Sequence, residues 1–231
     1  MLKRTSMPLQ ESTDGRVPAS EGRFPGYDVL SKQLGPSWNE KTREVIARRL
    51  SVGGKPRFFT AEEFQTVRAI AGRIVPQPRA RVPIPVAWLV DEKLHQGQSD
   101  GYRSAETPRE GDAWRQGLAA LDAEADQAFG ARFHNLSERD QDELIARMQN
   151  GELNGAAWKG MPAKDFFKKR MARDIVLAYY AHPSAWSEIG WGGPASPRGY
   201  VRMGFNERDP WEAAEASNSN VEAARRKNRR V

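Results

Sequence analysis

Apolar positions recur every three or four residues over several parts of the chain, which is the spacing of amphipathic helices. The most clearly bounded segment starts at Thr60, which is spaced from Glu63 as in a capping box. It stops before Pro76, because proline removes a helical hydrogen bond and restricts the residue before it. The pattern predicts a helix over residues 60–75 with an apolar face of Phe64, Val67, Ile70, Ala71 and Ile74.

The same periodicity predicts a shorter helix on each side of that segment. Ser37 and Glu40 have the spacing of a capping box, and Gly53 follows the last apolar residue, which predicts a helix near residues 38–51. After a proline-rich link, apolar residues predict another short helix over residues 87–94. The first of these helices is expected to pack on the residues that follow it.

The second half of the chain predicts three longer helices. Apolar residues advance by three and four positions from Asp112 until Gly130, a residue that suits the end of a helix. Further helices are predicted over residues 137–150 and 162–180, and Pro183 interrupts the pattern after the last of them.

No segment alternates in the manner of a β-strand, so the pattern predicts an all-α protein of five to six helices. The expected organisation is a single helical domain over residues 37–212, with a long aromatic, glycine- and proline-rich loop near its end. Residues 1–36 are rich in Pro, Gly, Ser and charge and are expected to be extended or disordered. Residues 213–231 are expected to form a basic, disordered tail.

The loop, residues 179–200, reads YYAHPSAWSEIGWGGPASPRGY and shows no helical or strand periodicity. Glycine and proline shape its backbone, and its Trp, Tyr and Arg residues are the types that dominate protein contacts. One interpretation is a partner-binding surface, with the candidate contact residues Trp186, Glu188, Trp191, Arg198, Tyr200 and, just beyond the loop, Trp211. The other is that these rings fold back and fill the protein's own core.

The formal net charge of +6 and the pI near 9.7 suggest an acidic partner until the charges are assigned to segments. Basic residues predominate before residue 59 and after residue 220, whereas residues 59–220 are slightly acidic. The basic cluster at the end of the chain is interpreted as a solvated tail. The alternative is a helical interaction module that binds nucleic acid or another acidic surface through this tail.

Candidate chemistry is sparse along the chain. There is no cysteine, which excludes disulfides, thiolate metal sites, cysteine-ligated iron–sulfur clusters and thiol catalysis. The three histidines lie far apart, and no phosphate-binding loop or nucleophile motif occurs. We therefore predict no catalytic, cofactor-binding or metal-binding residue. The remaining enzymatic hypothesis pairs Glu188 with His182 as acid and base, against a carboxylate that only holds the loop in shape.

No apolar run approaches the roughly 18 residues that suggest a transmembrane helix. The first residues, MLKRTSMPLQESTDGR, contain neither a twin arginine nor an apolar stretch, so the sequence predicts no export signal. The expected location is cytoplasmic. The alternative is the periplasm, reached by co-export with a partner or by membrane association through it.

Short motifs also occur in a characteristic order. In the first half they are Trp38, Arg43, Arg49-Leu50, Arg57-Phe58-Phe59-Thr60, Glu63, Ile74-Val75-Pro76-Gln77-Pro78, Pro83-Ile84 and Asp91-Glu92-Lys93-Leu94. In the second half they are Gly101-Tyr102-Arg103, Trp114-Arg115, Gly117-Leu118, Leu121-Asp122, Phe133, Leu136, Phe166-Phe167, His182-Pro183, Glu188-Ile189-Gly190, Gly193-Pro194-Ala195, Pro197-Arg198-Gly199-Tyr200 and Asp209-Pro210-Trp211-Glu212. This series, over residues 37–212, resembles the gluconate 2-dehydrogenase subunit 3 family.

The resemblance implies a non-catalytic accessory subunit of a sugar or alcohol dehydrogenase complex. It implies that FAD belongs to a large subunit of the glucose-methanol-choline type, and that haem c belongs to a cytochrome c subunit that often takes the electrons. The small subunit is then expected to bind the flavoprotein and to support its maturation or export. Many family members begin with a twin-arginine signal, and this chain departs from the family there.

Overall fold

The computed structural model describes residues 22–78, 82–99, 101, 105, 107–196, 199, 212–217 and 219–230. Over these residues the regular structure is helical, and β-type pairing is limited to one isolated bridge between Trp38 and Ser196. The all-α prediction is confirmed. In this part of the chain no helix has the length and apolar character needed to cross a membrane.

Helices α2 (Ala61–Ile74), α3 (Val86–His95) and α4 (Glu110–Phe129) form the first part of the main core. The predicted capping box at the start of α2 is present, because Thr60 Oγ1 accepts from the Glu63 amide and the Glu63 carboxylate accepts from the Thr60 amide. Gly130 ends α4 in the left-handed conformation, with φ of 72°. The capping box and the glycine therefore predicted the start of α2 and the end of α4 correctly.

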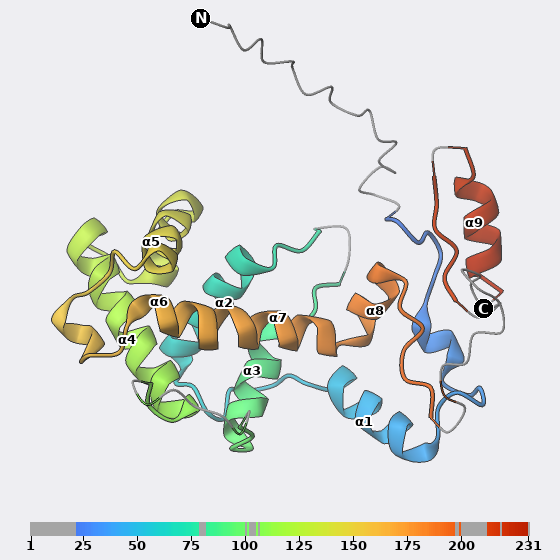
Figure 1. Cartoon of the computed structure of the whole chain (residues 1–231), viewed down its shortest axis with the longest axis horizontal. Helices are drawn as coiled ribbons and strands as arrows, with labels where there is room; N and C mark the ends of the chain where they lie inside the picture. Colours follow the sequence, from blue (N-terminus) through green and yellow to red (C-terminus); the bar gives the residue numbers. More distant parts are fainter. Residues whose placement is uncertain are drawn as a thin grey trace, which may run out of the picture.

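A long helical rod crosses the molecule along its longest axis (Figure 1). It consists of α6 (Ala163–Phe166), a π-helical turn (Phe167–Met171) and α7 (Ala172–Ala181). The sequence predicts this rod as one helix, without the π turn. Helix α5 (Glu138–Asn150) packs on it, and short 3₁₀ turns occur at Phe133–Asn135 and Ala156–Trp158.

The rod packs closely on α4 at the centre of the main core. The rings of Trp114 and Phe166 meet edge to face at 5.7 Å. A methyl group placed on Gly117 would lie only 2.3 Å from the Phe166 ring, so glycine is required for this approach of α4 to α6.

Helix α1 (Glu40–Leu50) starts later than its sequence pattern suggests. Its N-cap is Asn39, whose side chain accepts from the Thr42 amide at 2.9 Å, so the capping box predicted at Ser37 is wrong. The reason is long-range pairing: the Ser37 carbonyl accepts from the Ser196 amide at 2.8 Å, and the Asn39 amide donates to the Ser196 carbonyl at 2.9 Å. These bonds keep the residues before Glu40 out of the helix.

Helix α8 (Pro183–Ile189) lies inside the segment predicted to lack helical structure, and that prediction is wrong for these seven residues. Proline is favoured at the first position of a helix, because its missing amide has no helical partner there. Pro183 therefore begins a new helix, and the Nδ1 atom of His182 caps it by accepting from the Ser184 amide at 3.2 Å.

Residues before and after the predicted domain join residues inside it in a second hydrophobic cluster. Its buried members are Phe24, Tyr27, Val29, Trp38, Ile46, Trp186 and Ala213. Within the N-terminal segment that was expected to be extended or disordered, residues 22–36 are described and contain a 3₁₀ turn (Val29–Lys32). The expected disordered tail contains α9 (Val221–Asn228). The N-terminal segment is held by apolar contacts of the cluster, and α9 by hydrogen bonds of Asn228 to Pro25 and Ala214. Composition does not reveal such long-range contacts.

Candidate partner interface

Three of the six residues predicted to contact a partner lie in the part of the chain that the structure describes. Trp186, Glu188 and Trp191 lie on or just after α8. Arg198, Tyr200 and Trp211 lie outside the described residues, so the predictions for them stay as predictions.

Trp186 is an internal residue of this chain, with 3% of its surface exposed. Its indole Nε1 donates to the Tyr180 carbonyl at 2.6 Å, and the guanidinium of Arg49 lies 5.8 Å from the centre of its ring. Trp186 thus joins α8 to α7 and α1.

Trp191 follows α8 and is 41% exposed. Its ring meets that of Trp186 edge to face at 4.8 Å, and its carbonyl accepts from the Tyr27 hydroxyl at 3.4 Å. One side of the indole is supported by the second cluster while the other stays accessible. Of the two interpretations of the aromatic loop, the core interpretation describes Trp186. Trp191 is accessible, and its contact with a partner stays a prediction.

Glu188 and His182 have different surroundings. The Glu188 carboxylate accepts from the Tyr179 hydroxyl, which ties α8 to the end of α7. His182 is 7% exposed and caps α8; burial and the nearby Arg49 guanidinium lower the pKa of its imidazole. These contacts give both side chains a role in holding the junction between α7 and α8.

Large exposed apolar side chains gather along α7 and α8, and we name them the α7–α8 row: Val176, Leu177, Tyr180, Ile189 and Trp191. Each is between 37% and 51% exposed. Val176, Leu177 and Tyr180 share one face of α7, because residues three and four apart are neighbours on a helix. A concentration of exposed apolar surface on one part of a protein is typical of an interaction site.

A cleft of about 880 Å³ adjoins this row, bounded by α1, α3 and α7. Apolar side chains of all three helices line it, among them Val45, Trp88, Leu89 and Leu177. Leu177 belongs to both features, so the cleft meets the α7–α8 row at this residue.

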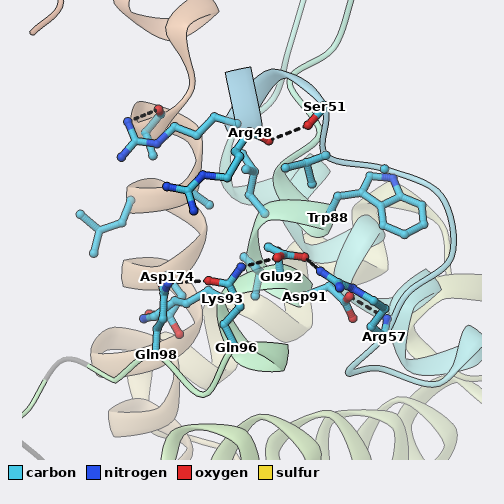
Figure 2. Close-up of a pocket in the computed structure, with 18 of the residues that line it drawn as sticks. Arg48, Ser51, Arg57, Trp88, Asp91, Glu92, Lys93, Gln96, Gln98 and Asp174 are labelled. Carbon is cyan, nitrogen blue, oxygen red and sulfur yellow. Dashed lines mark hydrogen bonds and ion pairs between the residues drawn. The ribbon is translucent and has the colours of Figure 1, made fainter. Parts of the chain in front are cut away.

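Three carboxylates line the cleft, and each is engaged by groups of this chain (Figure 2). Asp91 accepts from the backbone amides of Arg57, Phe58 and Phe59, at 2.8, 3.0 and 2.9 Å. Glu92 pairs with the Arg57 guanidinium. Asp174 accepts from Lys93 Nζ at 2.9 Å and from the indole of Trp114 at 2.8 Å.

The cations on the α1 side, unlike these carboxylates, are not held in ion pairs among the described residues. Arg49 donates to the Ala181 carbonyl at 3.0 Å, and burial together with its neighbour Arg48 lowers the pKa of its guanidinium. Arg48 and Lys55 are exposed, and among the described residues neither has a carboxylate within ion-pair distance. Glu44 acts on Arg48 only through a longer-range attraction, since its carboxylate pairs with Lys41. The cleft therefore combines an apolar lining with exposed cations that form no ion pair among the described residues.

A comparison with protein-family models matches residues 61–193 to gluconate 2-dehydrogenase subunit 3. The chain belongs to the gluconate 2-dehydrogenase subunit 3 family. This membership confirms the resemblance seen in the motifs and supports an accessory subunit of a dehydrogenase complex. Searches of the curated proteins and of the solved structures found no match to the chain.

The family match runs from α2 to just beyond α8, so it includes the whole α7–α8 row and leaves out α1 and α9. The α3 and α7 sides of the cleft thus belong to the family region, whereas Arg48 and Arg49 come from outside it.

Sequence reasoning missed the cleft, because its lining residues come from three separate helices. It also missed the exposure of Val176, Leu177, Tyr180 and Ile189. A signal was present: on the predicted helix, residues 176, 177 and 180 lie beside one another, and Asp174 and Ile175 already supply its buried face. Which face of a helix is exposed depends on its neighbours, so periodicity alone did not decide it.

Proposed function

We propose that this chain is a non-catalytic accessory subunit that binds the FAD-dependent large subunit of a sugar or alcohol dehydrogenase complex. The partner is expected to be of the glucose-methanol-choline type, with electrons passing to a cytochrome c subunit. Family membership supports the dehydrogenase complex. The observation that carries the binding role is the α7–α8 row, which leaves five large apolar side chains accessible within the family region.

The physical basis is the burial of apolar surface against a partner. Removing an exposed aromatic ring from water releases free energy in proportion to its apolar area, and tryptophans are enriched among the residues that dominate binding. Trp191 meets this description, because its ring packs on Trp186 and 41% of its surface is still exposed.

Support for maturation or export of the flavoprotein is part of the same proposal. A small subunit that covers an apolar surface of a newly folded partner lowers the exposure of that surface to aggregation. We propose that assembly takes place in the cytoplasm and that the final compartment of this chain is that of its partner.

The test of partner identity is gentle purification of the protein from its native host, followed by its mass and visible absorbance. The expected result is a complex several times heavier than the 25.9 kDa chain, with the absorbance of a bound flavin. A colourless monomer, or oxidation of gluconate or another polyol by the isolated chain with a dye acceptor, would contradict the proposal.

The test of the surface compares Trp191→Ala with Leu34→Ala, a matched change of an exposed apolar residue outside the α7–α8 row. Trp191→Ala is expected to weaken association with the flavoprotein by about 2 kcal/mol or more, the loss typical of a hot spot. Leu34→Ala is expected to leave the affinity unchanged. Binding is measured by titration calorimetry and folding by circular dichroism. Equal affinities of the two variants would exclude Trp191 as a contact residue.

A further inference from the structure

We propose that the cleft between α1, α3 and α7 binds an amphipathic, carboxylate-bearing segment of the dehydrogenase large subunit. The proposal rests on the proposed function, because it names the part of that partner which this surface receives. It adds a site that is distinct from the α7–α8 row but meets it at Leu177.

The shape of the cleft suits a chain segment. A space of about 880 Å³ is far larger than the voids left by ordinary core packing and lies within the range of natural binding pockets. Its apolar lining includes Val45 and Val52 on the α1 side, Leu89 on α3 and Ala178 on α7. Several adjacent apolar side chains of a partner would bury their surface here.

The charge of the cleft determines which polar groups the partner segment is expected to carry. Glu92 and Asp174 are paired with Arg57 and Lys93, and Asp91 is buried against three backbone amides. None of the three carboxylates is therefore presented to an incoming cation. Arg48 and Lys55 are exposed without a carboxylate partner among the described residues, and Arg49 binds a backbone carbonyl. A carboxylate between these groups would form charge-assisted hydrogen bonds, which guanidinium groups make in a paired geometry.

The cations on the α1 side and the engaged carboxylates lie on opposite sides of the cleft. In Figure 2, Arg48 and Ser51 lie on one side of the cleft, while Asp174, Lys93, Glu92 and Arg57 form a row across the other. Trp88 lies between them at one end. An incoming segment is therefore expected to direct its carboxylates toward α1 and its apolar side chains toward α3 and α7.

A protein segment fits this lining better than nucleic acid. Single-stranded nucleic acid is bound by aromatic platforms on which bases stack. The aromatic residue of the cleft, Trp88, is half-buried and packs with Phe64 of α2 at 4.3 Å between ring centres. The remaining uncharged lining is largely aliphatic, which suits apolar side chains rather than bases.

The test uses the purified large subunit and compares two doubly charge-reversed chains with the same change of net charge. Arg48→Glu with Lys55→Glu alters the cleft. Arg68→Glu with Arg139→Glu alters exposed positions on α2 and α5. Affinity is measured at low and high salt, and circular dichroism checks folding. The cleft variant is expected to bind at least about tenfold more weakly, with a smaller salt dependence, and the control variant within about twofold of the natural chain.

A photo-reactive amino acid in place of Leu89, which lines the cleft and lies outside the α7–α8 row, identifies the occupant by cross-linking and mass spectrometry. The expected product is a peptide of the large subunit with Asp or Glu beside apolar residues. A cross-linked peptide without carboxylates, one from this chain's own residues, or a cross-linked nucleic acid would overturn the proposal.

The outcomes also separate this proposal from the proposed function. If the natural chain does not associate with the flavoprotein at all, both fail. If the complex forms and Trp191→Ala weakens it, while the cleft variant and its control bind equally well, only the assignment of the cleft is overturned.

Discussion

His182 lies at the junction of α7 and α8 and caps α8 through its Nδ1 atom. Burial and the Arg49 guanidinium disfavour its charged form, so its pKa in the folded protein lies below the ordinary value of about 6.5. The folded state thus binds fewer protons at this site than the unfolded state over the interval between the two pKa values. Its contribution to stability is complete above about pH 6.5 and decreases as the pH falls through that interval.

The corresponding variant is His182→Asn, which keeps a side-chain oxygen suited to an N-cap but cannot titrate. We expect the natural chain to lose more free energy of unfolding than the variant when the pH falls from neutral to about 5. Urea unfolding at both pH values measures the difference. Asp122, whose pKa is raised by burial, is present in both chains, so its effect cancels. Identical losses would show that His182 is not the titrating group.

At the scale of elements, the packing of α4 on α6 depends on the absence of a side chain at Gly117. A methyl group there would overlap the Phe166 ring, and both residues lie in the centre of the main core. Gly72, on the exposed side of α2, has no atom within 4 Å of such a methyl group. These two helical glycines therefore form a matched pair, one limited by packing and one only by helix propensity.

Gly117→Ala is expected to lower the free energy of unfolding by about 1–3 kcal/mol, the usual cost of overpacking a core. Gly72→Ala is expected to raise it by up to about 1 kcal/mol, because alanine is the better helix former. Chemical denaturation monitored by circular dichroism measures both. If Gly117→Ala were as stable as Gly72→Ala, α4 and α6 would have room to separate and the close approach would not limit the fold.

At the scale of the whole molecule, the second hydrophobic cluster connects both ends of the described chain to α8. Asn228 of α9 supports it: the side-chain Nδ2 donates to the carbonyls of Pro25 and Ala214 at 2.9 and 3.0 Å, and Oδ1 accepts from the Ala214 amide at 2.6 Å. The side of α8 that is buried in the cluster thus depends on segments far away in sequence. The α7–α8 row and the cleft lie near this junction with the main core.

Asn228→Ala removes these three hydrogen bonds. The Pro25 carbonyl and the Ala214 carbonyl and amide then lose their side-chain partner. We expect a loss of about 1–3 kcal/mol of local stability, the cost of unsatisfied buried polar groups. Hydrogen exchange is expected to accelerate in residues 22–36 and α8 and to stay unchanged in α4. Asn150→Ala, at an exposed asparagine of α5, is the control. Uniform acceleration across both clusters would show that the molecule opens as one cooperative unit.

The sequence by itself determined the helical class, the family resemblance and several helix ends. Thr60 with Glu63 and Gly130 act on backbone groups only a few residues away, so their effects can be read from neighbouring positions. The resemblance likewise needed only the order of motifs, which the family match over residues 61–193 confirms.

Only the tertiary structure decided which aromatic residues are buried and where a cleft forms. Trp186 and Trp191 are five residues apart in similar surroundings of sequence, yet one fills the second cluster and the other remains accessible. Helix α8 was missed because its stability comes from burial against Val29 and Trp38, not from its short, proline-initiated sequence. Burial and clefts depend on contacts between segments distant in the chain, and local patterns of hydrogen bonding and polarity do not specify those contacts.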